Sequence, residues 1–449
     1  MRKFLRGNLL LFSILITSQI VKAQQSYSLR EAVDYAVKNH TSIKNAQIDI
    51  LSAEARVSEL KGIGLPQVSA NIGYTNNIII PKVFIPAKTF DPNAKEGDVI
   101  AAEFGVANSG QAGINLSQIL FDGSYLLGLK AADVYKELSK KSLVQTKLQA
   151  AENVTKTYYA ILVNDERIKL FSLNIGRLDS LLRDTRALNA QGFVEKIDVQ
   201  RLEVQLNNLK IEMKNVSRLQ DLTYNLLKFQ MGNKINDSIT LTDKLSDINM
   251  AEVMPEIPQD FKYANRIEYS MLETQNRLAE LDLKNQKVGY FPRVMLTGGY
   301  NYSAGRPKFT DLITKPWVNA ATLGFAIQVP IFDGFQRKYK IAQSQNSLQQ
   351  IKNNFGLLEN SIDLQIKQGH ISLKNAYETL QEQKSNMELA KEVVRVSKIK
   401  YQQGVGSNLE VVDAEISYKE AQVNYFTTFY DALVAKVDLD KALGRLYSE

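Results

Sequence analysis

The apolar residues of segment 335–400 recur every three or four positions, with Gln, Asn and Lys between them. This spacing puts them on one face of an α-helix, as in a coiled coil. Segment 124–189 is also free of proline and has helical spacing. We therefore predict one long helix over each segment, roughly 100 Å long at 1.5 Å per residue. The clearest run of apolar positions is Leu348, Ile351, Phe355, Leu358 and Ile362.

Shorter segments with the same spacing predict further helices. In each half of the chain, two of them together have about the length of one long helix, which suggests that two short helices stack end to end beside a long one. The chain would reverse at two Gln-Gly pairs, where Gly192 and Gly404 can end a helix. The shorter predicted helices cover residues 30–62, 193–230, 261–288 and 407–443.

Four segments alternate between apolar residues and small or polar ones, which is typical of β-strands. They cover residues 67–77, 107–119, 293–303 and 321–331. Strands of about 10 residues with one apolar face suit a membrane β-barrel that has a wet interior. A soluble, half-buried sheet shows the same alternation, so the pattern alone does not separate the two interpretations.

The number of predicted strands has a consequence for assembly. Four strands are too few to close a transmembrane barrel, which takes roughly eight. Unpaired strand edges are not tolerated in lipid. The membrane interpretation therefore requires several copies of the chain arranged in a ring.

The chain carries one structural plan twice. The tetrapeptides LFDG at 120–123 and IFDG at 331–334 are 211 residues apart, and each ends a strand segment and begins a long helix. The two Gln-Gly pairs follow at almost the same offset, 212 residues. We predict a first repeat over 24–232, a connecting segment over 233–260 and a second repeat over 261–449.

Residues 1–23 predict a secretory signal peptide. Three basic residues precede an apolar run at 9–16, which is too short to span a bilayer, and Ala23 is a small residue suited to cleavage. Without the four basic residues of this segment, 51 basic residues face 48 acidic ones, and the net charge falls from +7 to +3. The basicity therefore belongs largely to the targeting segment, and nucleic acid is not an expected partner.

The composition argues against an enzyme. The chain has no Cys and two His residues, His40 and His370, which excludes disulfides, thiolate zinc sites, Cys nucleophiles and poly-His metal sites. Neither a nucleophile-elbow motif nor a P-loop nor an HExxH motif occurs. We expect no catalytic residues, no metal site and no cofactor.

The order of these elements resembles the TolC family of outer-membrane efflux proteins over residues 27–445. The resemblance implies an α+β membrane protein with two repeats, each of two β-strands and long coiled-coil helices. It implies a homotrimer with a 12-stranded β-barrel in the outer membrane of a Gram-negative bacterium, continued by a periplasmic α-helical barrel. Residues 77–106 and 304–319 would be external loops, and 233–260 a segment at the equator of the helical barrel.

The function that the resemblance implies is an exit duct in contact with outer-membrane lipid. It would passively conduct small amphiphilic molecules received from an inner-membrane transporter through a periplasmic adaptor. Type I protein secretion and metal-ion efflux use the same architecture, so the cargo stays open. A non-conducting outer-membrane scaffold or adhesin, and a soluble coiled-coil adaptor, are alternatives of a different class.

The resemblance also assigns a gate near the helix tips, at Gly192 and Gly404. Tyr401 matches the gating tyrosine of the family, and Glu410 and Asp413 match two acidic rings. Asp198 matches the gate aspartate of the first repeat. Gly406 stands at the position of a gating arginine, so the closing network must differ.

Glu410 and Asp413 have different alternative explanations. Ser407 and Glu410 have the spacing of a capping box, which would explain Glu410 without a gate. A cap does not explain Asp413, for which we favour a position facing the lumen. In a trimer each acidic position would supply three carboxylates, and such a ring favours cations.

Overall fold

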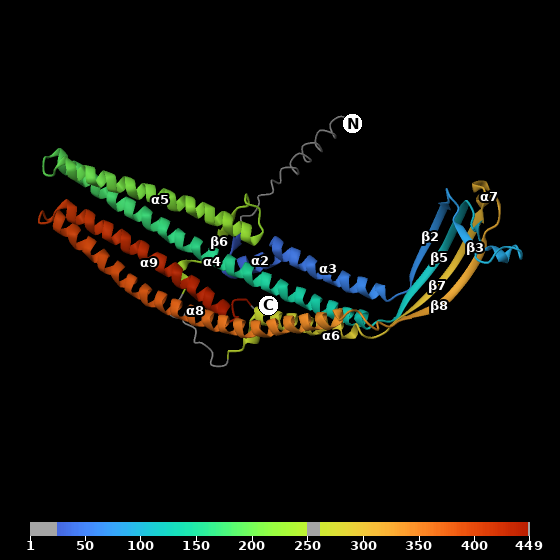
Figure 1. Cartoon of the computed structure of the whole chain (residues 1–449). Helices are drawn as coiled ribbons and strands as arrows, with labels where there is room; N and C mark the ends of the chain where they lie inside the picture. The colour runs from blue at the N-terminus through green and yellow to red at the C-terminus, as the bar shows by residue number, and fades with distance from the viewer. Residues whose placement is uncertain (1–24, 249–260, 448–449) are drawn as a thin grey trace, which may run out of the picture. The chain divides into compact units, whose positions relative to one another are not determined.

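The computed structural model describes residues 25–248 and 261–447. The predicted signal peptide and the proline-containing part of the connecting segment lie outside these residues. The chain divides into two compact units, and Figure 1 shows the helices and strands that make them up. Of the described residues, the helical unit comprises 25–48, 140–248, 261–271 and 355–447, and the sheet unit comprises 49–139 and 272–354. Each unit therefore draws on both halves of the sequence.

Helices form most of the described chain. The residues of the predicted apolar run at 348–362 are all half-buried or buried, while most residues between them are exposed. The first half of the chain contains α2 (Leu29–Asn39), α3 (Thr41–Ile63), α4 (Gly123–Ala190) and α5 (Lys196–Met231). The second half contains α6 (Ile267–Val288), α7 (Phe309–Thr314), α8 (Gln336–Gln402) and α9 (Asn408–Ala442).

The predicted single helix over 30–62 is wrong, because the chain breaks at His40. His40 has extended backbone angles, φ −61° and ψ 135°, and its N–H still donates to the carbonyl of Ala36 at the end of α2. Its Nδ1 accepts a hydrogen bond of 3.3 Å from the N–H of Ser42 at the start of α3. His40 is thus a cap between two helices. Helix α2 begins with a complete capping box between Ser28 and Glu31.

The sheet unit contains an antiparallel sheet of β2 (Gln67–Asn76), β5 (Asn108–Phe121), β7 (Arg293–Arg306) and β8 (Val318–Gln328). The strand order is β2-β5-β7-β8, so one strand pair from each half of the sequence meets at the β5–β7 junction. Strand β7 extends to Arg306 and β8 begins at Val318 and ends at Gln328, whereas the sequence predicted 293–303 and 321–331. Pro330 lacks an N–H and cannot donate to a strand ladder, which fits the earlier end of β8.

Two small sheets were not predicted. Strand β1 (Gln25–Tyr27) pairs in parallel with β6 (Ile239–Leu241), which ties the start of the described chain to the connecting segment. Strand β3 (Lys82–Pro86) pairs antiparallel with β4 (Val99–Glu103) inside the predicted external loop 77–106. Helix α7 lies inside the other predicted loop, 304–319.

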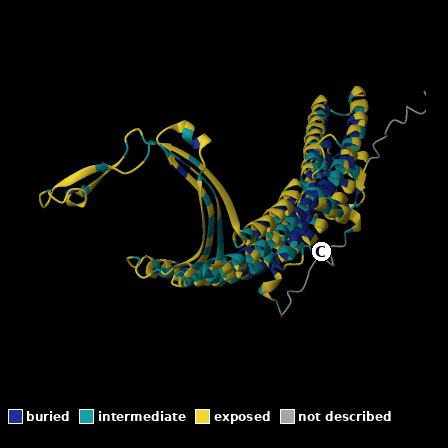
Figure 2. Cartoon of the chain, turned by 90° about the vertical axis from the view of Figure 1, so that its right-hand side faces the viewer, coloured by how far each residue is buried: buried dark blue, intermediate teal, exposed yellow. Residues whose placement is uncertain are grey.

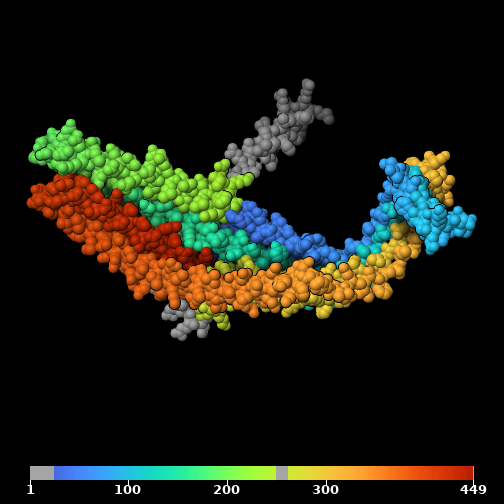
Figure 3. Space-filling view, viewed as in Figure 1, coloured from blue at the N-terminus to red at the C-terminus, as the bar shows by residue number. Residues whose placement is uncertain are grey.

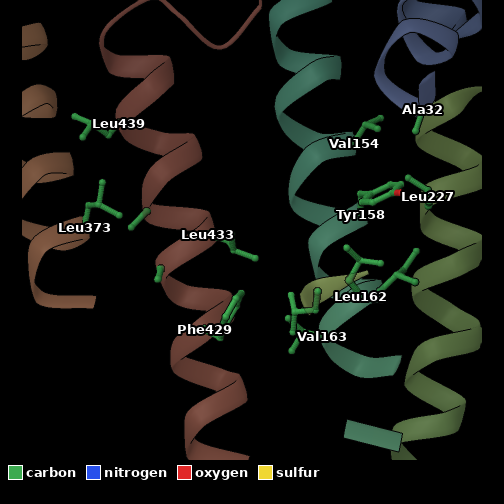
Figure 4. Close-up of a cluster of buried hydrophobic side chains, with 14 of the residues drawn as sticks. Ala32, Val154, Tyr158, Leu162, Val163, Leu227, Leu373, Phe429, Leu433 and Leu439 are labelled. Atoms are coloured by element: carbon green, nitrogen blue, oxygen red, sulfur yellow. The ribbon is translucent and has the colours of Figure 1, made fainter. Parts of the chain in front are cut away.

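The core of the helical unit gathers side chains from α2, α4, α5, α8 and α9 (Figure 4). Tyr158, Leu227, Leu433 and Leu439 are all 0% exposed. Burying each such side chain contributes about 1.5–3 kcal/mol. The Tyr158 hydroxyl donates to the carbonyl oxygen of Tyr27 at 3.0 Å, so its polar atom is satisfied inside the core.

Among the described residues, the sheet has no comparable core. Every residue of β8 is exposed, and Ile72 on β2 and Leu323 on β8 are 88% and 78% exposed. Figure 2 shows buried residues concentrated in the helices and mostly exposed or half-buried residues along the four strands. Apolar exposure of this extent indicates contact with a partner or a membrane.

Within residues 25–248 and 261–447, no helix combines the length and the apolar character needed to cross a membrane.

Candidate functional site

Two helix tips form the candidate site, and a left-handed glycine shapes each of them. Gly192, with φ 79°, follows α4, and the N–H of Phe193 donates to the carbonyl of Leu188 at 3.0 Å. Gly404, with φ 72°, follows α8, and the N–H of Val405 donates to the carbonyl of Lys400 at 3.0 Å. Glycine adopts this conformation without the clash that a Cβ atom brings, and the bonds satisfy carbonyls that the helix end leaves free.

Tyr401 points into an apolar cluster between the two tips. It packs against buried residues that include Leu202 on α5 and Val411 on α9. Its hydroxyl is buried and has no hydrogen-bond partner among the described residues. An unpaired buried hydroxyl costs free energy, so a hydrogen-bond partner from outside the chain would stabilise this position.

Glu410 forms half of the predicted capping box. Its N–H donates to Ser407 Oγ at 3.2 Å, but its carboxylate lies 3.0 Å from Lys400 Nζ, on the other side of the turn. The pair is about half exposed, so it contributes little to stability. Its effect is to leave Glu410 largely neutralised at the tip. Glu410 thus takes part in the helix cap through its N–H and forms an ion pair through its carboxylate. The sequence did not predict this ion pair with Lys400.

Asp413 and Asp198 differ in their surroundings. Asp413 is exposed, and within the described part of the chain no cation lies within ion-pair distance of it. Asp198 is half-buried, and its Oδ1 is 3.7 Å from Arg201 Nη1. Its backbone carbonyl accepts a hydrogen bond of 3.3 Å from Asn408 Nδ2, which links the first tip to the second. Asn408 is buried and was not predicted as a site residue.

A polar seam above the tips joins α4 to α8 and α9. Arg177 Nη2 lies 3.4 Å from Glu415 Oε2, and its guanidinium lies over the ring of Tyr418 at 5.0 Å. Lys398 Nζ on α8 lies 3.9 Å from the other carboxylate oxygen of Glu415. Asn174 Nδ2 donates to Gln422 Oε1 at 2.9 Å. The only sequence signal for this seam was the presence of polar residues on otherwise apolar helix faces.

A second set of ion pairs joins α4 to α9 away from the helix tips. The Glu152 carboxylate is 2.8 Å from Lys156 Nζ and 2.7 Å from Lys441 Nζ, and Lys156 also reaches Asp438. Burial alone would raise the pKa of Glu152, but the hydrogen bonds and charges of the two lysines outweigh it and lower that pKa. Glu152 is therefore ionised at neutral pH.

Two helices of the unit carry exposed apolar stripes in addition to their buried faces. In the space-filling view α5 (green) and α8 (orange) border opposite edges of the helical region (Figure 3). Several stripe residues are seven positions apart, the repeat of a coiled-coil seam. The α5 stripe consists of Val204, Ile211, Leu219, Leu222, Leu226 and Phe229, and the α8 stripe of Leu357, Leu364, Ile371, Leu389, Val393 and Val396.

The sheet leaves two open edges. Strand β2 pairs with β5 alone and β8 pairs with β7 alone, so each outer strand has one unpaired row of backbone N–H and C=O groups. Among the described residues no group of three or more His, Cys, Asp or Glu side chains could hold a metal ion. The features that need partners outside the chain are therefore the exposed apolar stripes and the open strand edges.

The second half of the chain matches the sequence profile of the family described as "Outer membrane efflux protein" over residues 264–445. A similar curated protein is the probable efflux pump outer membrane protein TtgC of Pseudomonas putida, 21% identical over 317 residues. That alignment covers 68% of this chain and 62% of the relative, so the matched part spans somewhat under two thirds of that protein.

Two further comparisons extend over nearly the whole chain. The outer membrane protein TolC of Vibrio cholerae is 18% identical over 93% of this chain and 91% of its own length. The solved structure of the Campylobacter jejuni CmeC outer membrane channel has a TM-score of 0.72 and 16% identity, and covers 93% of this chain and 86% of that one. The structural likeness establishes the fold.

These matches bear on several predictions. The resemblance to the TolC family, the α+β fold class and the outer-membrane location are confirmed. The prediction that this chain is not an enzyme is confirmed by its match to the outer membrane efflux protein family. The roles of Asp198, Tyr401, Glu410 and Asp413 stay predictions.

Proposed function

Because this chain is similar to TolC and other outer-membrane efflux proteins, we propose that it forms a homotrimeric exit duct for small amphiphilic molecules such as drugs and dyes. Cargo would arrive from an inner-membrane transporter through a periplasmic adaptor. The duct would bind no cofactor and catalyse nothing. The observation that carries the proposal is that one chain leaves unpaired strand edges on its sheet and exposed apolar stripes on its helices.

The open strand edges support assembly in a ring. In lipid, β2 and β8 need partners for their backbone groups, because an unsatisfied N–H or C=O there costs several kcal/mol. Pairing β8 of one copy with β2 of the next satisfies both edges. Three copies of the four-stranded sheet give the 12 strands that the family resemblance implies, which exceeds the roughly eight that a transmembrane barrel needs.

The exposed stripes support the same arrangement in the helices. The α5 stripe of one copy and the α8 stripe of the next both have coiled-coil spacing, and packing them together would remove their apolar side chains from water. Closing the ring in this way encloses a central space. The open strand edges and the exposed apolar stripes thus each support the same closed assembly.

The tips would form the narrow end of the duct. In a trimer Asp198, Glu410 and Asp413 each become a set of three carboxylates. Lys400 pairs with Glu410, and Arg201 lies near Asp198, whereas no cation of the described chain lies within ion-pair distance of Asp413. We therefore assign most of the ring charge to Asp413, which would make the passage prefer cations. Opening would be a change in packing of the helix tips.

Ion conductance separates the duct from a scaffold or adhesin. We expect the purified protein to conduct in planar bilayers, and Asp413→Asn to reduce the preference for cations. Asp431→Asn is the matched control, because 18 residues make five helical turns and leave it on the same face of α9, roughly 27 Å away. Absence of conductance from correctly assembled protein would remove the duct proposal.

Dye retention tests the cargo. Cells lacking this protein should retain more of an amphiphilic fluorescent dye, and re-expression should restore efflux. Unchanged retention in cells whose purified protein still conducts would favour one of the other cargoes of this architecture, a secreted protein or a metal ion.

A further inference from the structure

The connection between β2 and β5 folds as a two-stranded ribbon, and the described residues of the chain leave most of it exposed. We call residues 78–104 the ribbon. Its strands pair from Lys82 opposite Glu103 to Pro86 opposite Val99, and the Lys82 ammonium lies 3.3 Å from the Glu103 carboxylate. An isolated two-stranded ribbon is at best marginally stable in water. A stable ribbon therefore needs to pack against something else.

Both faces of the ribbon are apolar and exposed. One face carries Val83 and Ile100, and the opposite face carries Phe84 and Val99, because side chains alternate along a strand. Phe84 is 72% and Val99 61% exposed. In Figure 2 the ribbon is the mostly exposed hairpin beyond the end of the four-stranded sheet. Phe90 and Phe104 add two further exposed aromatic rings.

The equivalent connection between β7 and β8 behaves differently. Its helix α7 buries Leu312, and Trp317 Nε1 donates to the Leu312 carbonyl at 2.7 Å. The ring of Phe309 meets that of Tyr74 on β2 edge to face, with centroids 5.2 Å apart. This connection buries Leu312 and places Phe309 against its own sheet, although Ile313 stays exposed. Side chains of a connecting loop can therefore pack against this end of the sheet, and those of the ribbon do not.

Hydrogen bonds attach the base of the ribbon to the open side of the sheet. The N–H of Asn77 donates to the carbonyl of Ala107 at 2.7 Å, so the ribbon continues the β2–β5 pair. Tyr74 and Asn76 both donate to Asn108 Oδ1, which fixes the ends of these two strands. Strand β2 is an edge strand, so whatever completes that edge lies next to the ribbon.

The charge of the ribbon suits a second copy of itself. It contains three basic residues and four acidic ones, interspersed along the sequence. A lipid headgroup surface rich in phosphate would instead favour an excess of Lys and Arg. A nearly balanced mixture lets identical surfaces approach without strong repulsion.

We propose that the ribbons of neighbouring copies pack on one another through Phe84 and Val99 and form a shared apolar cap over the end of the barrel. The inference rests on the trimer of the proposed function, which brings the three ribbons to one end of the ring. The cap narrows the outer mouth of the duct. It also accounts for the difference between the two connections, since the ribbon finds its cover on other copies.

Cross-linking tests the contact directly, because the chain has no native Cys. Val99→Cys in the assembled full-length protein should form disulfide-linked dimers on mild oxidation. Ile313→Cys is the matched control, since Ile313 is 74% exposed in the other connection. We expect Val99→Cys to link roughly tenfold faster, because contact within one assembly raises the effective concentration.

A second variant tests the cap. Phe84→Ser combined with Val99→Ser should leave the trimer intact and increase its conductance, whereas Ile313→Ser should change neither. Native mass spectrometry of the detergent-solubilised protein reports the trimer separately. A trimer in which Val99→Cys links no faster than the control overturns the ribbon contact alone, and a monomer overturns the proposed function as well. Disulfides from Val99→Cys to a different protein in place of a second copy would also overturn it.

Discussion

The helical unit and the sheet unit handle apolar side chains in opposite ways. The helical unit buries Tyr158 and Leu433 completely, and the partners of both come from the same chain. The sheet unit exposes Ile72 and Leu323 almost completely. The first unit has a core of its own, whereas the second, under the proposed function, would depend on lipid and on other copies of the chain. A residue's exposure in one chain therefore has a different meaning in each unit.

This contrast predicts the largest effect for a truncation in the helical core. Leu433→Ala should lower the free energy of unfolding by about 2–5 kcal/mol, because it removes buried contacts and leaves a cavity. The control Leu323→Ala, on β8, should leave the helical transition unchanged. Denaturant unfolding followed by far-ultraviolet circular dichroism measures both. Equal losses in the two variants would mean that the two units do not differ in this way.

A charge on an exposed stripe should have a smaller effect on folding and a clear effect on assembly. Ile211→Glu, on the α5 stripe, should keep its helical content but weaken the trimer by roughly 1–3 kcal/mol per copy, since the carboxylate would be buried without a partner. Lys210→Glu, about 100° around the same helix, is the control. Native mass spectrometry distinguishes trimer from monomer. A stable Ile211→Glu trimer would place the α5 stripe outside the interface between copies.

The smallest effect concerns ion pairs in the two units. Glu152→Gln in the helical unit should cost about 1–2 kcal/mol at neutral pH, because Glu152 is buried between two lysines. Glu59→Gln in the sheet unit should cost at most about 0.5 kcal/mol, since its pair with Arg56 is exposed.

The pH dependence of stability tests whether the charge of Glu152 explains this effect. The folded-state pKa of Glu152 is lowered, so its contribution is present above the ordinary carboxyl pKa and is lost as the pH falls through the lowered value. The stability difference between the wild type and Glu152→Gln should shrink over that acid range. A difference that stays constant to low pH would show that packing and not charge explains the effect.

Much of the local structure was predictable from residue spacing. The long helices lie at Gly123–Ala190 and Gln336–Gln402, close to the predicted 124–189 and 335–400, because helical periodicity sustained over this length outweighs local exceptions such as Gly176 and Gly356. The break at His40 was missed, since one residue with extended backbone angles hardly changes the apolar pattern around it. The end of β8 was misplaced because alternation continues past its last ladder bond.

The candidate site was less predictable. The sequence located both turns, but it did not show that Lys400 pairs with Glu410 or that Asn408 bonds to the backbone of Asp198. Many lysines and asparagines lie on these helix faces and look equivalent in the sequence. Which of them finds a partner depends on the geometry of the turn and on the rotation of each helix.

The sequence by itself therefore determined the kind and order of the elements, because apolar periodicity and backbone preferences act over a few residues. It also determined that one chain cannot close its own sheet, since that follows from the number of strands. Only the tertiary structure decided which polar side chains meet, such as Arg177 with Glu415, and which apolar surfaces are left over. These outcomes depend on distances between segments far apart in the chain, which no local pattern specifies.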